Sequence, residues 1–315
     1  MTKSSSHRAR PATTRRPQGR RRRRSTNPAR SIAALVVVLA ILAGLGWGSY
    51  KVWKTVDPFG TVEPEGCRVT VSGQSYDLDL EQSQNAAIIT AESIRRGLSA
   101  HAATVALATA MQESKLRNID YGDRDSLGLF QQRPSQGWGT SKQIMDPWYS
   151  SGKFYEELVK FGNWKDISVN DAAQQVQRSG YPEAYRQHEP LAQAWASALT
   201  GHSPSALSCV NRSSETTTID KLTQTVRKGM AAKISIQTTG ATATFTATDL
   251  VSTRAAVALT MASTNLGPID RATVATTSWS ADPEHHASWS AASGPSASPA
   301  ASGTGRVTGT VTARS

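Results

Sequence analysis

The 315-residue sequence lacks the motifs that mark several large enzyme classes. It has only two cysteines, Cys67 and Cys209, without CxxC spacing and without a second cysteine or a histidine at ligand spacing, so we expect no metal site there. It also has no His-Glu-x-x-His segment and no glycine-rich phosphate-binding loop. Zinc proteases and nucleotide-binding enzymes are therefore without support, and no cofactor is implied.

Acidic residues are missing from the first thirty positions, which hold eleven of the 35 lysines and arginines. The rest of the chain is neutral, with 24 basic and 24 acidic residues. A segment this basic and this poor in apolar residues cannot bury a core, so residues 1–30 are predicted to form a disordered cytoplasmic tail. The arginine run Arg20–Arg24 is compatible with a nucleic-acid partner, but the apolar run that follows makes this the weakest interpretation, and no nucleic-acid partner is expected.

That apolar run predicts a transmembrane signal anchor over residues 31–50. It is nearly uninterrupted from Ile32 to Gly48, about long enough to cross a bilayer, and the arginine cluster before it would stay inside the cell. We therefore expect a single-pass protein of the cell membrane whose later domains are extracytoplasmic. A cleaved secretory signal is the alternative, but the run exceeds the usual ~7–15 residues and no clean Ala-x-Ala site follows. Residues 51–66 would form a stalk.

Outside the cell, two lone cysteines that bracket one domain most simply form a disulfide. Cys67 and Cys209 lie at the two ends of a predicted domain, residues 67–209. Two free buried thiols are the alternative.

Helical periodicity dominates residues 67–209. A short strand pair is predicted over 68–78 and a first helix over 80–96. A second helix opens with Ser99 and runs to Glu113, and its many small residues predict close packing on all sides.

The composition changes after Cys209. Residues 210–218 are predicted to be a linker, and residues 219–285 mix helical and alternating patterns that indicate a small α/β domain of unknown role. Residues 286–315 are rich in alanine, serine and glycine, and we predict a disordered tail there.

Ala106–Gly139 is the stretch that carries chemistry: an apolar helix ends on the carboxyl group of Glu113, and a turn region rich in glycine and glutamine follows. Cleavage of a glycosidic bond needs a proton donor near neutral pH, and a desolvated carboxyl group can supply one. An ordinary glutamate at a helix end is the alternative, and the spacing alone does not decide between them.

The surrounding motif resembles the superfamily of lytic transglycosylases and goose-type lysozymes. Glu113-Ser114 is followed by the segment Gly128-Leu129-Phe130-Gln131 and by Pro134, where that family has Glu-Ser, Gly-Leu-Met-Gln and a proline. The run is also similar to lysozyme-like modules of actinobacterial cell-wall proteins and phage tail proteins. The resemblance covers about residues 67–209.

By position, the resemblance implies that Glu113 is the catalytic acid and base. The family's Tyr-Asn-Ala-Gly motif has no literal copy here, and Gln177 and Tyr185 are its nearest counterparts. The substrate-binding residues implied in this way are Ser114, Gly128, Gln131, Gln132, Gln177 and Tyr185.

Three further residues are candidates from their type alone. Trp138 lies between two glycines, and its ring could stack on a sugar, although most aromatic residues belong to a core. Asp123 and Asp125 are candidates for the second carboxylate with which a hydrolase activates water. Turn residues that bond their own backbone are an equally good interpretation, whereas a calcium loop is disfavoured.

The sequence thus predicts an α+β chain: a mainly helical lysozyme-like domain, preceded by one transmembrane helix and followed by a small α/β domain. The predicted function is cleavage of the β-1,4 bond between the amino sugars of peptidoglycan, with the lytic transglycosylase reaction favoured over hydrolysis by a muramidase. The alternative is an inactive or weakly active glycan-binding tether between membrane and wall. No protein partner is indicated.

Overall fold

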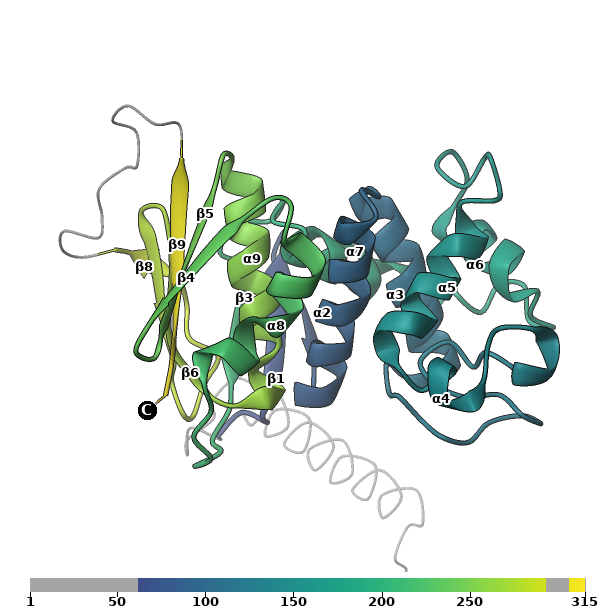
Figure 1. The fold of residues 1–315 in the computed structure, drawn as a ribbon, viewed down its shortest axis with the longest axis horizontal. Helices are drawn as coiled ribbons and strands as arrows, with labels where there is room; N and C mark the ends of the chain where they lie inside the picture. Colours follow the sequence, from purple (N-terminus) through teal and green to yellow (C-terminus); the bar gives the residue numbers. More distant parts are fainter. Residues whose placement is uncertain (1–61, 293–305, 315) are drawn as a thin grey trace, which may run out of the picture. The chain divides into compact units, whose positions relative to one another are not determined.

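Two antiparallel sheets and eight α-helices form the part of the chain that the computed structural model describes, residues 62–292 and 306–314 (Figure 1). The first sheet has the order β2-β1-β3, with β1 at Gly66–Val71, β2 at Gln74–Leu78 and β3 at Leu207–Val210. The second has the order β4-β5-β9-β6-β7-β8, with β4 at Ser235–Thr239, β5 at Thr242–Ala247, β6 at Ile269–Val274, β7 at Thr277–Ser280, β8 at Ser290–Ala291 and β9 at Val307–Ala313. The helices are α2 (Leu80–Arg95), α3 (Ala100–Ser114), α4 (Ser141–Ile144), α5 (Pro147–Leu158), α6 (Val169–Gln177), α7 (Glu189–Leu199), α8 (Ile219–Met230) and α9 (Leu250–Ala262).

The first sheet joins the two ends of the region predicted as residues 67–209. β1 pairs with β2 in a hairpin, as predicted, and with β3, which places Cys67 directly opposite Cys209. The two residues form a disulfide, with their Cα atoms 4.0 Å apart. The predicted pairing is therefore present, and it links the start of this region to its end.

Helix α3 is the central helix of this region, and most of its residues are buried. It begins after Ser99, as predicted. It ends because Lys115 and Leu116 both adopt the left-handed conformation, with φ of 57° and 58°, and the Leu116 N–H bonds back to the carbonyl of Ala110. Glu113 consequently lies in the last turn of a rigid helix.

The second sheet corrects the predicted fold class. An α/β domain needs parallel strands joined by long crossovers, whereas all pairs here are antiparallel. Residues 240–241 and 275–276 join β4 to β5 and β6 to β7, and connections this short can link only antiparallel strands. The described chain is therefore α+β with two antiparallel sheets, and strands contribute more of it than predicted.

The prediction of a disordered tail over residues 286–315 is wrong for Val307–Ala313. This segment is β9, which lies between β5 and β6 in the middle of the sheet. Its register pairs Phe245 with Gly309 and Ala272 with Val311. Its small and β-branched residues alternate between buried and partly exposed positions, a period-2 pattern that the low-complexity composition concealed.

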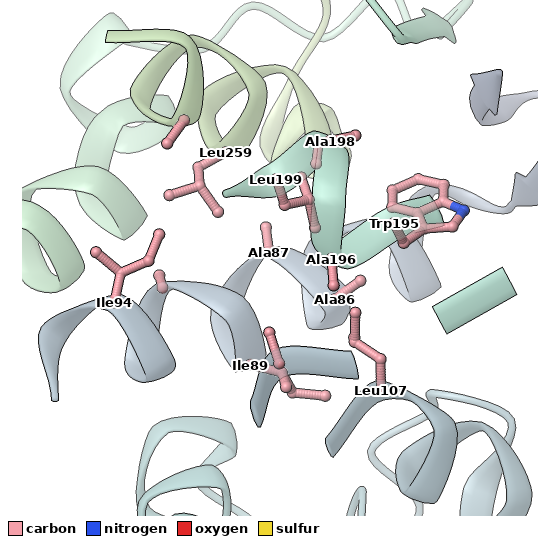
Figure 2. Packing of buried hydrophobic residues seen from close by; sticks show 14 of the residues in the cluster. Ala86, Ala87, Ile89, Ile94, Leu107, Trp195, Ala196, Ala198, Leu199 and Leu259 are labelled. Atoms are coloured by element: carbon pink, nitrogen blue, oxygen red, sulfur yellow. The ribbon is translucent and has the colours of Figure 1, made fainter. Parts of the chain in front are cut away.

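The regions predicted as separate domains, residues 67–209 and 219–285, share one hydrophobic core. Figure 2 shows Leu259 of α9 close to Leu199 of α7 and Ala87 of α2. The C-terminal region is therefore an integral part of the described fold.

Helix α8 approaches α2 closely at Gly229. A Cβ atom at this position would lie 2.6 Å from the Cβ of Ala91 and 2.9 Å from its carbonyl oxygen. Only glycine permits this approach, because any side chain would push the two helices apart.

The prediction of a single-pass membrane protein is also corrected. Within residues 62–292 and 306–314, no helix is long and apolar enough to cross a membrane. The longest, α2, has 16 residues, whereas a span needs about 20. The predicted tail over 1–30 and anchor over 31–50, with most of the stalk over 51–66, lie outside the described residues.

Candidate active site

A groove with a volume of about 920 Å³ opens beside the C-terminal end of α3. Its walls come from the loop between α3 and α4, from α5, and from the end of α6 with the residues that follow it. Of the sequence-predicted site residues, it is lined by Glu113, Asp123, Gln131, Gln132, Trp138 and Gln177.

Glu113 is half-buried in this groove, and its carboxylate is held by one neighbour from far along the chain. The hydroxyl of Tyr185 donates a hydrogen bond to Glu113 Oε1, at 2.8 Å. The Tyr185 side chain is fully buried, and burial together with the nearby Glu113 carboxylate raises the pKa of Tyr185 far above its usual value. Tyr185 therefore stays a proton donor to Glu113 at neutral pH and fixes its position, instead of contacting a ligand directly.

Ser114 and Gln177 hold the wall of the groove. Ser114 is buried, and its hydroxyl lies 2.8 Å from the carbonyl oxygen of Leu129. Gln177 Nε2 donates to the carbonyl oxygen of Phe130, at 2.9 Å. Both side chains thus form hydrogen bonds with the backbone of the segment between Gly128 and Gln132. The bond from Gln177 connects the end of α6 to the loop that follows α3.

Gly128 and Gln131 set the shape of that loop. Gly128 has φ of 73°, and a Cβ atom there would lie 2.8 Å from the carbonyl oxygen of Ile144, so no other residue fits. Gln131 is also left-handed, with φ of 48°, and its Nε2 lies 3.3 Å from the carbonyl oxygen of Tyr121. A non-glycine residue in this conformation is uncommon and is a feature of functional loops.

Gln132 and Trp138 are held within the fold. Gln132 is only 2% exposed, and its Nε2 donates to the carbonyl oxygen of Ser150, at 3.0 Å. Trp138 is partly buried and packs against the hydrophobic core. At the groove these two residues contribute mainly to the shape of its floor.

The two candidate aspartates differ sharply. Asp125 accepts hydrogen bonds from the Ser135 backbone N–H at 2.8 Å and from Arg133 Nε at 2.7 Å. These contacts, the backbone one first, hold the pKa of Asp125 well below its usual range. Asp125 is therefore engaged as an ionised turn residue, whereas the Asp123 side chain lines the groove and is 88% exposed.

Sequence reasoning missed several residues at the groove. Lys153 and Glu157 project into it from α5, and Arg178, in the left-handed conformation with φ of 51°, ends α6 beside it. Tyr181 follows the lining residue Gly180 and is 79% exposed, unusually high for an aromatic side chain. No motif marks these positions; the signal available was the amphipathic pattern of α5 and the end of α6.

Over residues 62–292 and 306–314, no three His, Cys, Asp or Glu side chains gather as a metal site would require. Comparison of the chain with protein-family models and with curated proteins finds no match.

Proposed function

We propose that this protein cleaves the glycan strands of peptidoglycan at the β-1,4 bond between N-acetylmuramic acid and N-acetylglucosamine, with Glu113 as the general acid and base. The observation that carries the proposal is the setting of Glu113: a carboxyl group at the end of a buried helix, half-buried in an open groove, with one oxygen held by Tyr185. The resemblance of residues 113–134 to lytic transglycosylases and goose-type lysozymes supports the same residue.

In this reaction Glu113 donates its proton to the glycosidic oxygen as the bond from that oxygen to C1 breaks, so the leaving sugar departs with a neutral hydroxyl. Positive charge develops at C1 and at the ring oxygen. The resulting carboxylate then takes a proton from the hydroxyl that attacks C1, which restores the protonated Glu113.

The attacking hydroxyl decides between the two branches. Attack by the 6-hydroxyl of the same muramic acid residue gives a 1,6-anhydro sugar and needs no second carboxylate, whereas hydrolysis uses a carboxylate to activate water. We favour the transglycosylase reaction because the carboxylates of Asp125 and Glu157 are paired with Arg133 and Lys160, and Asp123 is 88% exposed. Asp123 remains the residue to test if hydrolysis is found.

The test is digestion of purified peptidoglycan by the full-length protein. Wild type is compared with Glu113→Gln and with Glu215→Gln, a matched change at an exposed residue far from the groove in sequence. We expect Glu113→Gln to release soluble fragments at least about a hundredfold more slowly, because general acid and base catalysis contributes that much or more, and Glu215→Gln to match wild type. If the wild-type protein binds the strands but releases no fragments, the proposed cleavage is wrong and the glycan-binding tether becomes the better account.

A further inference from the structure

A second cavity, with a volume of about 160 Å³, lies away from the groove. It is lined by the end of α7, the segment that leads into β3, one face of α9, the turn between β6 and β7, and Trp289. None of its lining residues belongs to the groove beside Glu113.

The inner wall of this cavity is apolar and firmly held. Leu207, Val257 and Met261 are each no more than 2% exposed and form its floor. Trp289 closes one side, and its indole Nε1 donates to the carbonyl oxygen of Leu207, at 2.7 Å. Because these residues are part of the core or bonded to it, the cavity is preformed, as binding sites for small molecules usually are.

Among the described residues that line the cavity, Arg254 of α9 is the only charged one. Its side chain is half-buried, and within the described residues no carboxylate forms an ion pair with it. A guanidinium beside apolar walls loses part of its hydration and gains most from an anion that it can bind through two hydrogen bonds. The lining therefore combines an apolar pocket with one anion-binding group.

Backbone strain lies at the rim of the same cavity. Ser205 and Ala275 line it, and both adopt the left-handed conformation, with φ of 54° and 50°. Ala275 owes this conformation to the two-residue turn between β6 and β7, whereas no tight hairpin accounts for Ser205 in the segment that leads into β3. A strained non-glycine residue such as Ser205 is typical of ligand sites, and this observation is independent of the charge at Arg254.

We propose that this cavity binds a small organic monoanion: a carboxylate that pairs with Arg254, on an apolar body of about the size of a phenyl ring or a short alkyl chain. The size follows from the volume, which is close to that of cavities known to hold benzene.

The test is titration of the full-length protein with benzoate, followed by calorimetry and by ligand-observed NMR. Benzyl alcohol is the neutral counterpart of the same size. Arg254→Gln removes the charge, Ala258→Leu fills the cavity from α9, and Arg271→Gln removes an exposed arginine on β6 that does not line it. Near-ultraviolet circular dichroism reports whether each variant is folded.

We expect saturable binding of benzoate by wild type and by Arg271→Gln. Binding is expected to weaken at least about tenfold in Arg254→Gln and for benzyl alcohol, since a charge-assisted hydrogen bond is lost. A folded Ala258→Leu should not bind. The inference is overturned if wild type shows no saturable binding at millimolar benzoate, if Arg254→Gln binds as wild type does, or if Arg271→Gln weakens binding equally.

Discussion

Removal of the disulfide between Cys67 and Cys209 is expected to destabilise the protein strongly. The bridge closes a loop with a sequence separation of 142 residues, for which the chain-entropy model gives about 5 kcal/mol of stabilisation at 25 °C. Both cysteines are buried and sit opposite each other on paired strands, so the folded state already holds them at bonding distance. Removal of the bridge therefore acts mainly on the unfolded chain, because its conformational entropy rises.

The double variant Cys67→Ala/Cys209→Ala tests this in urea, beside wild type with and without a reducing agent. We expect the free energy of unfolding to fall by about 3 to 5 kcal/mol and the melting temperature by roughly 10 to 20 °C. Reduced wild type should approach the variant, and the reducing agent should leave the variant unchanged. A loss below about 1 kcal/mol would refute the reasoning, since a linked unfolded chain must be at least that much more restricted.

Three further predictions concern other contacts. Tyr185→Phe should lower kcat on glycan strands about tenfold to a hundredfold in a folded protein, because Glu113 loses the hydrogen bond that fixes its position; an unchanged kcat would contradict this role. Burial alone would raise the pKa of Glu63, but hydrogen bonds led by the His286 backbone N–H hold it at about 2, below its usual 4.5. The stabilisation by ionised Glu63 is therefore complete above about pH 4.5 and is lost as the pH falls toward 2. The free energies of unfolding of wild type and Glu63→Gln should converge across that window, and a difference that stays constant with pH would exclude this role of Glu63. Deletion of residues 306–315 removes β9 from the middle of its sheet and should abolish cooperative unfolding, whereas a cooperative transition at the wild-type temperature would count against the shared core.

Elements with capping residues close in sequence were predictable. Asp79 forms a capping box with Gln82 at the start of α2, and Ser99 occupies the N-cap position of α3 without a side-chain hydrogen bond. In both cases the residue type that marks the start of the helix lies next to that start in the sequence. β9 was missed because its alternating Val and Thr residues follow a long segment rich in alanine, serine and glycine, a composition typical of disorder. Its partners Phe245 and Ala272 also lie more than thirty residues away, so no nearby signal showed that this segment pairs.

The candidate site also combines features that the local sequence marks with contacts between distant residues that it does not mark. The motif that begins at Glu113 identifies a carboxyl group and a loop that the structure brings to one groove. The motif could not tell that Ser114 and Gln177 bond the loop backbone, or that Tyr185 bonds Glu113. Those contacts join residues far apart in the chain, and residue type alone does not specify which polar atom a side chain reaches. Glu157 was missed for a related reason, since only the packing of α5 turns it toward the groove.

The most direct test of the central claim is the chemistry of the sugar ends that the full-length protein leaves on digested peptidoglycan, read by mass spectrometry. We predict 1,6-anhydromuramic acid ends from wild type and from Glu215→Gln, and none from Glu113→Gln. Reducing ends from wild type would move the reaction to hydrolysis and direct attention to Asp123. Anhydro ends from Glu113→Gln at the wild-type rate would contradict the assignment of Glu113 as the catalytic acid and base.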